Sequence, residues 1–103
     1  MGTHYILDGH ETKEVDLMTW ARWFEKANRR VAEDTIMGSR ISTVFLGLNY
    51  NWEENGKPLL FETLIFGGKL DGEMERYATW DEAETGHKAT VKRVRREEYE
   101  NHK

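Results

Sequence analysis

Glu62 and His87 are the residues of this chain best suited to acid–base chemistry. Glu62 falls in the middle of PLLFETLIFGG, a segment with the composition of a β-strand. A carboxylate in such a segment needs a cationic partner, which Arg30, Arg40 or a cation on a helix could supply. His87 lies beside Gly86 on the predicted inner face of a helix, a position typical of a hydrogen-bonded, half-buried histidine.

The other histidines do not have the spacing of a metal site. His4 and His10 flank a turn predicted at Asp8-Gly9, whose register places them on opposite faces of a hairpin. His102 lies in the C-terminal tail. The chain has no cysteine, which excludes thiol catalysis, disulfides and thiolate zinc sites. The sequence therefore predicts neither a metal nor another cofactor.

Composition and charge are those of a small acidic domain. The chain has 103 residues, of which 38% are hydrophobic and 33% charged, and its formal net charge is −4. This length predicts a single domain over residues 1–96, followed by a polar, frayed tail over residues 97–103. No apolar run approaches the ~20 residues that a membrane-spanning helix needs.

The charge distribution also bears on partners. An acidic balance argues against nucleic acid, because nucleic-acid-binding domains usually carry a basic surplus. The basic residues are concentrated between Lys88 and Arg96. This cluster is interpreted as a solvated helix end, where cations complement the helix dipole, with a phosphate-binding patch as the alternative.

Turn and capping signals predict elements in the order β-β-α-β-β-β-β-α. Asp16 precedes LMTWARWFEKAN as an N-cap, and Thr79 with Glu82 forms a capping box before the last helix. The expected fold is α+β, with a mostly antiparallel sheet of about four main strands packed by two helices. Gly86, inside the last helix, indicates a close approach of that helix to the sheet.

Three predicted two-residue turns, at Gly38-Ser39, Asn55-Gly56 and Asp71-Gly72, would determine which strand residues face each other. Closing the chain at Asn55-Gly56 pairs Leu46 with Ile65. The residues that then share one side of the sheet form the expected core: Val31, Val44, Leu46, Leu48, Tyr50, Trp52, Leu59, Phe61, Thr63 and Ile65.

The other side of this sheet is expected to be apolar as well. Phe45 opposes Phe66, and Phe66 opposes Tyr77. A sheet face in water is normally polar, so this side is a candidate interface. Three occupants remain open: one of the two helices, a second copy of the chain, or another macromolecule or ligand. The interface candidates are Ile36, Ile41, Phe45, Leu64, Phe66 and Tyr77, with Asp34, Asn49, Glu62 and Glu75 around them, and the polar site candidates are Glu62, Glu75 and His87.

Four segments together resemble a family of small uncharacterised proteins encoded by tailed bacteriophages and prophages. They are DLMTWARWFE, RISTVFLGLNYNW, PLLFETLIFGG-LDGE and RYATWDEAETGH, within which the motifs are TWxxWF, STVFLG, FETxxFGG and RYxTWxEAxxGH. The resemblance covers about His4 to Val94. It departs from the family at WEENGKP, where the family has a glycine- and proline-rich loop. The resemblance implies a phage origin and a host bacterial cytoplasm, and it brings no catalytic residues.

The function expected from these observations is non-catalytic binding by a small phage accessory protein. Such a protein would act as a homodimer, as a modulator of a host protein, or as both. Two alternatives remain open. One is a small-ligand or nucleotide-binding protein, and the other is a small hydrolase that uses Glu62 and His87.

Overall fold

The computed structural model describes residues 2–51, 53 and 56–101, and it confirms the α+β class and the expected order of elements. Both sheets are antiparallel. The strands are β1 Tyr5–Asp8, β2 Glu11–Glu14, β3 Arg30–Ile36, β4 Ser39–Phe45, β5 Phe61–Phe66 and β6 Met74–Tyr77, and the helices are α1 Leu17–Lys26 and α2 Trp80–Asn101.

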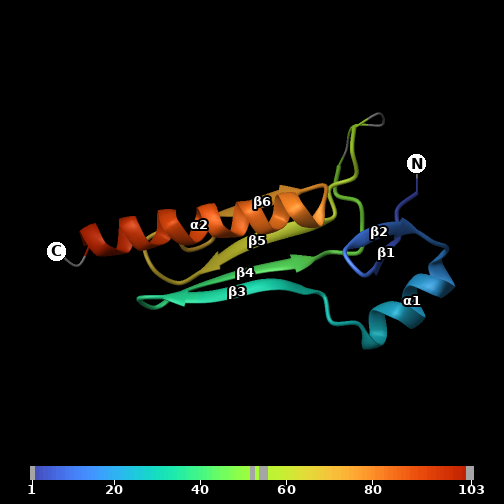
Figure 1. Cartoon of the computed structure of the whole chain (residues 1–103), viewed down its shortest axis with the longest axis horizontal. Helices are drawn as coiled ribbons and strands as arrows, with labels where there is room; N and C mark the ends of the chain where they lie inside the picture. The colour runs from blue at the N-terminus through green and yellow to red at the C-terminus, as the bar shows by residue number, and fades with distance from the viewer. Residues whose placement is uncertain (1, 52, 54–55, 102–103) are drawn as a thin grey trace.

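Four strands form one sheet in the order β3-β4-β5-β6, while β1 and β2 form a separate hairpin. Figure 1 shows α2 running along the length of the four-stranded sheet, with α1 at one end of the molecule beside β1 and β2. Trp23 of α1 meets Phe45 edge-on at 5.6 Å between ring centroids, so α1 packs against the end of the sheet. The alternative in which the two helices cover one face each is therefore wrong.

Both predicted helix caps are confirmed. The Asp16 carboxylate accepts a hydrogen bond from the amide of Thr19 at 2.8 Å. The amide of Glu82 donates to the Thr79 hydroxyl, and the amide of Thr79 donates to the Glu82 carboxylate, each at 3.1 Å. Helix α2 continues to Asn101, so residues 97–101, which were expected to fray, are helical. No helix in the described part of the chain is long and apolar enough to cross a membrane.

The turn between β3 and β4 has two central residues, Met37 and Gly38, with φ of 48° and 89°. Ile36 therefore faces Ser39 directly across the hairpin. The turn lies one residue earlier than the expected Gly38-Ser39. Positive φ at both central residues is characteristic of the tight hairpin turns whose twist matches that of the strands.

The register between β4 and β5 differs from the expected one. Ile65 faces Ile41 rather than Leu46, and β4 ends at Phe45. Trp52 and Asn55, on which the expected turn depended, lie outside the described residues. The observed register differs from the expected one by an odd number of residues. An odd shift places every side chain of β5 on the opposite face from the one expected relative to β4.

After β4 the chain pairs with the N-terminal segment as well as with the residues before β5. The carbonyl of Gly47 accepts a hydrogen bond from the amide of Tyr5 at 2.9 Å, and the amide of Asn49 donates to the carbonyl of Thr3 at 3.1 Å. Gly47 has φ of 79°, where a side chain would be strained. Leu46 donates from its amide to the carbonyl of Leu60 at 2.7 Å, so the predicted pairing of Leu46 with Ile65 is wrong.

The register between β5 and β6 is shifted in the same way. Tyr77 faces Phe61, where the sequence predicted Phe66. Residues 67–73 form a loop in place of a two-residue turn, with Gly67 and Gly68 at φ of 85° and 80°. Because this shift is also odd, Tyr77 lies on the opposite face of the sheet from Phe66.

Helix α2 thus covers one face of the four-stranded sheet. Phe45, Phe61 and Tyr77 belong to one core cluster under α2, and Ile41 and Ile65 belong to a second. The prediction that Phe45, Phe66 and Tyr77 share a face is wrong. Of the interface candidates, Ile36, Ile41, Phe45 and Tyr77 lie on the face that α2 covers, whereas Leu64 and Phe66 lie on the other.

Candidate functional site

His87 projects from α2 into the interface with the sheet and is 3% exposed. Its Nδ1 lies 2.7 Å from the hydroxyl of Thr43 on β4. Its Nε2 lies 2.8 Å from the carboxylate of Asp34 on β3. The prediction of a hydrogen-bonded histidine is confirmed, and the ring is more deeply buried than expected.

A row of polar side chains continues from His87 across the sheet. The hydroxyls of Thr43 and Thr63 lie 2.5 Å apart, and the Tyr77 hydroxyl donates to Thr63 at 3.2 Å. With Asp34, the row takes one residue from each strand of the sheet. Burial raises the pKa of Tyr77 above its ordinary value of 10.0. The hydrogen bonds satisfy polar groups that would otherwise be costly to bury.

The order Asp34, His87, Thr43 has the residue types of a hydrolytic triad, in which a hydroxyl is activated by an imidazole that a carboxylate orients. Thr43 is 0% exposed and Thr63 is 2% exposed. A nucleophile must reach a substrate, and the Thr43 hydroxyl is enclosed between α2 and the sheet. The row therefore works as an internal polar connection between the helix and all four strands.

Glu62 lies on the other side of the sheet from His87, because its neighbour Thr63 faces α2. Arg76 donates to the Glu62 carboxylate from Nε at 3.0 Å. This partner is neither Arg40 nor Arg30, the two strand arginines considered from the sequence. Since the sheet separates Glu62 from His87, the two side chains cannot share one catalytic site.

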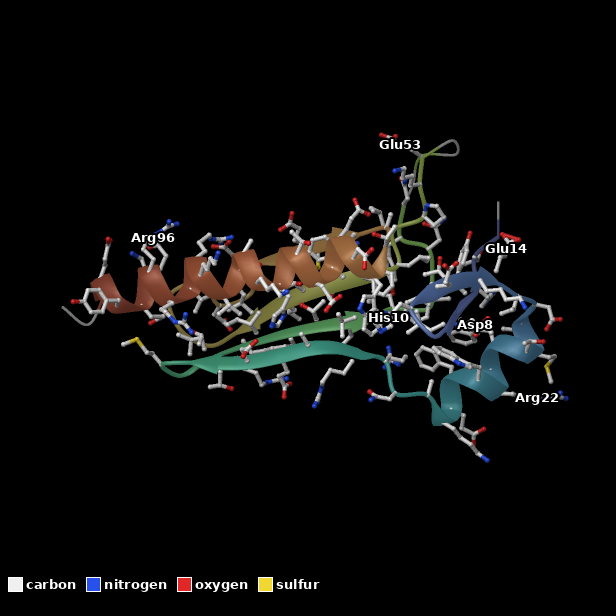
Figure 2. All side chains as sticks on the ribbon, in the orientation of Figure 1. Asp8, His10, Glu14, Arg22, Glu53 and Arg96 are labelled. Carbon is white, nitrogen blue, oxygen red and sulfur yellow. The ribbon has the colours of Figure 1, made fainter. Side chains whose placement is uncertain are left out.

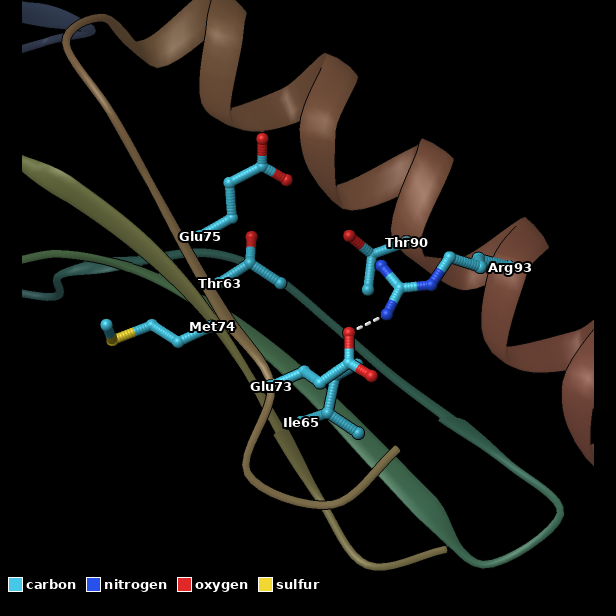
Figure 3. A pocket seen from close by; sticks show the side chains of 7 residues that line it. All are labelled: Thr63, Ile65, Glu73, Met74, Glu75, Thr90 and Arg93. Atoms are coloured by element: carbon cyan, nitrogen blue, oxygen red, sulfur yellow. Dashed lines mark ion pairs between the residues drawn. The ribbon is translucent and has the colours of Figure 1, made fainter. Parts of the chain in front are cut away.

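Glu75 lies at the β6 edge of the covered face, 3.5 Å from the Tyr77 hydroxyl. Figure 3 shows it at a shallow groove between β6 and α2, closed on one side by an ion pair between Arg93 and Glu73. The groove encloses about 90 Å³. This volume holds a few waters at most, so Glu75 has no substrate-sized space beside it.

The histidines near the N-terminus pack against tryptophans. His4 meets Trp20 edge-on at 5.2 Å, and His10 stacks on Trp80 at 3.8 Å, with an interplanar angle of 8°. His102 lies outside the described residues. Among the described residues, no group of three or more histidine or acidic side chains is placed to hold a metal ion.

The face of the sheet opposite α2 is here called the open face. It carries a mixture of apolar side chains and ion pairs, and its apolar members Phe66 and Met74 are 40% and 51% exposed. Arg40 lies over the Phe66 ring at 4.2 Å and pairs with Glu33 at 2.9 Å. By register, the open face consists of Arg30, Glu33, Thr35, Arg40, Ser42, Val44, Glu62, Leu64, Phe66, Met74 and Arg76.

A groove of about 250 Å³ runs between β3 and α2. Three cations line it from successive turns of α2, and the Asp34–His87 pair lies at its base. We call it the basic groove, and its lining residues are Asp34, His87, Lys88, Val91, Lys92 and Arg95.

Some of these residues were not singled out from the sequence. Thr43 and Thr63 are ordinary strand formers at their positions, so nothing local marks them as partners of His87. Lys88, Lys92 and Arg95 did carry a signal, because a spacing of four and then three residues places them on one side of a helix. Comparison of the chain with protein-family models, with curated proteins and with solved structures finds no match.

Proposed function

We propose that this protein is a non-catalytic binding protein that acts as a homodimer through its open face. The observation that carries the proposal is a four-stranded sheet with a helix on one face only. Leu64 and Phe66, two of the residues named as interface candidates from the sequence, lie on the open face.

The exposed area supports a second copy as the occupant. The chain exposes 6812 Å². A compact monomer of 12.2 kDa exposes roughly 6,060 Å². The excess, roughly 750 Å², is close to the ~800 Å² that each partner contributes to a stable protein–protein interface.

The side-chain types on the open face are also those of an interface. Phenylalanine, methionine and arginine are enriched in interfaces, and here Phe66, Met74, Arg40 and Arg76 occupy one surface. Each arginine has a carboxylate partner on the same face. A surface that carries both signs of charge can meet a copy of itself across a two-fold axis without like charges opposing each other.

The resemblance to small proteins of tailed bacteriophages extends this proposal to an accessory role in the host bacterial cytoplasm, with a host protein as a further partner. The alternative of a hydrolase that uses Glu62 and His87 together has no support, because the sheet lies between the two side chains.

The test is a pair of methionine substitutions. Met74→Asp places a charge on the open face, whereas Met18→Asp places the same charge on α1, where Met18 is 62% exposed. We expect light scattering to show a dimer for the parent protein and for Met18→Asp. Met74→Asp should be monomeric. Its dimer dissociation constant should rise roughly 100-fold, because dimerisation would bury an unpaired carboxylate.

Circular dichroism should show the same folded content for both variants. A parent protein that stays monomeric up to millimolar concentration would refute the homodimer. So would a Met74→Asp variant that dimerises as tightly as Met18→Asp, because the contact would then lie elsewhere.

A further inference from the structure

Strand β3 is an edge strand, hydrogen-bonded to β4 on one side only. Its hairpin closes with the two-residue turn at Met37-Gly38, so Ile36 and Ser39 form the pair next to the turn. In an antiparallel pair, alternate residues direct their amide and carbonyl groups to the partner strand. The groups of Glu33 and Thr35 therefore point to the free edge, where another strand could bind them.

The basic groove lies along this free edge. Lys88, Lys92 and Arg95 line it, and within the described residues none of the three forms an ion pair. One carboxylate, that of Asp34, also faces the groove, and it is bonded to His87. Three cations against one carboxylate leave the groove positive in a chain whose net charge is −4. A positive groove in an acidic protein selects an anionic partner.

We propose that an extended acidic peptide binds here, adding to β3 as a fifth strand with its carboxylates in the basic groove. Peptides are recognised in this way when a sheet edge supplies main-chain hydrogen bonds and a neighbouring groove takes alternate side chains. This inference is independent of the homodimer, because the free edge of β3 and the open face are different surfaces.

The spacing of the cations fits such a ligand. Helix α2 runs along the strands of the sheet, so the groove is parallel to the edge (Figure 1). Lys88 and Lys92 are one helical turn apart, a rise of about 6 Å. Alternate side chains of a strand recur every ~6.7 Å. Acidic residues at every second position of the peptide would therefore meet successive cations of α2.

The test is a titration of the isotope-labelled protein with acetyl-(Glu-Val)4-amide, followed by amide NMR. We expect shifts at Glu33, Thr35 and the groove-lining turns of α2, and slower hydrogen exchange at the amides of Glu33 and Thr35. Lys92→Glu should weaken binding roughly tenfold, because it reverses a charge in the groove. Arg96→Glu is the matched control, since Figure 2 shows Arg96 projecting from α2 on the side away from β3. It should leave the affinity unchanged.

A second pair of variants tests strand addition itself. Thr35→Pro removes one outward amide without removing a bond to β4, and proline is tolerated on edge strands. We expect it to abolish binding, while Thr35→Ala retains it. Equal losses in Lys92→Glu and Arg96→Glu, equal binding of acetyl-(Lys-Val)4-amide, or unchanged binding by Thr35→Pro would each overturn the proposal. Binding of an octathymidine strand in place of the peptide would do so as well. Repeating the titration on Met74→Asp separates this result from the oligomeric state.

Discussion

Gly86 illustrates how one missing side chain allows two elements to approach each other. A Cβ at this position would overlap the Tyr77 ring and hydroxyl. The close approach of helix to sheet predicted from this glycine is therefore confirmed. Glycine inside a helix costs about 1 kcal/mol relative to alanine. That cost is tolerated here because any side chain at position 86 would collide with Tyr77.

We expect Gly86→Ala to lower the free energy of unfolding by about 2 kcal/mol, because overpacking outweighs the gain in helix propensity. Urea unfolding measures the effect. Ala89→Gly, at an exposed position of the same helix, should also destabilise the protein, by about 1 kcal/mol. A stabilised Gly86→Ala variant would show that the contact with Tyr77 does not constrain the helix.

Tyr77 provides a prediction on pH dependence. Burial raises its pKa, so the folded protein holds the phenol proton more tightly than the unfolded chain does. The resulting stability is fully present below pH ~10, the pKa in the unfolded chain, and falls as pH rises through the folded-state pKa. Tyr77→Phe should lower stability at neutral pH by about 1 kcal/mol through loss of the bond to Thr63.

The two proteins should therefore converge in stability as pH rises, when urea unfolding is measured between about pH 8 and 11. Some pH dependence should remain in Tyr77→Phe, because burial also raises the pKa of Tyr5. A constant difference in stability across this range would mean that the phenol proton of Tyr77 is not held more tightly in the folded state.

At the scale of elements, α2 is anchored near both ends. The capping box at Thr79 fixes its start, and Glu98 fixes its last turns. Glu98 is 2% exposed, and its carboxylate accepts from the amide of Lys69 at 2.6 Å and from the hydroxyl of Ser39 at 3.2 Å. The last turns of α2 are thereby tied to the loop after β5 and to the start of β4.

Glu98→Ala should lower the free energy of unfolding by about 2 kcal/mol, because it leaves the part-buried amide of Lys69 and the buried hydroxyl of Ser39 without this acceptor. Glu98→Gln keeps the acceptor oxygen and should cost less. Hydrogen exchange at the Lys69 amide gives a local readout, and it should accelerate in Glu98→Ala. If the alanine variant had unchanged exchange at Lys69, the tie between α2 and this loop would be refuted.

The elements were predictable from the sequence where the determining interactions are local. The Asp16 cap, the Thr79–Glu82 box and the order of strands each depend on residues within a few positions of one another. The buried Glu98 gave no such signal, because its partners Ser39 and Lys69 are distant in sequence. A polar residue near a helix end is normally solvated, which is why this segment was expected to fray.

The registers were not predictable, for a related reason. A two-residue turn at Asp71-Gly72 is the simplest local interpretation, but Gly67 and Gly68 take positive φ and lengthen the loop. After β4, the chain also pairs with Thr3 and Tyr5, which are distant in sequence. Contacts between residues distant in sequence therefore help to set the registers. In the observed registers Phe45 lies under α2, and Phe66 is the exposed aromatic residue of the candidate interface.

At the scale of the whole molecule, the shape is long and thin. The principal extents are 51 × 30 × 20 Å, and the radius of gyration is 15.1 Å. A compact chain of this length has a radius of gyration near 13 Å. The smallest extent corresponds to one sheet and one helix, so the open face is a consequence of the two-layer shape.

The two proposed surfaces combine in one assembly. Pairing of two open faces would leave both β3 edges and both basic grooves accessible, so a dimer would present two peptide sites related by a two-fold axis. A partner with two acidic segments would then bind more tightly than one with a single segment, because the second contact would be intramolecular. The dimer is therefore expected to favour repetitive acidic partners.

The position of α2 at the end of the fold has a consequence for biosynthesis. A ribosome makes the four strands before it makes the helix that shields Phe45, Phe61 and Ile65. Until α2 has left the exit tunnel, both surfaces of the nascent sheet are uncovered and prone to aggregate. The fold should therefore become stable only after α2 has been synthesised. Chains truncated before Trp80 should be insoluble.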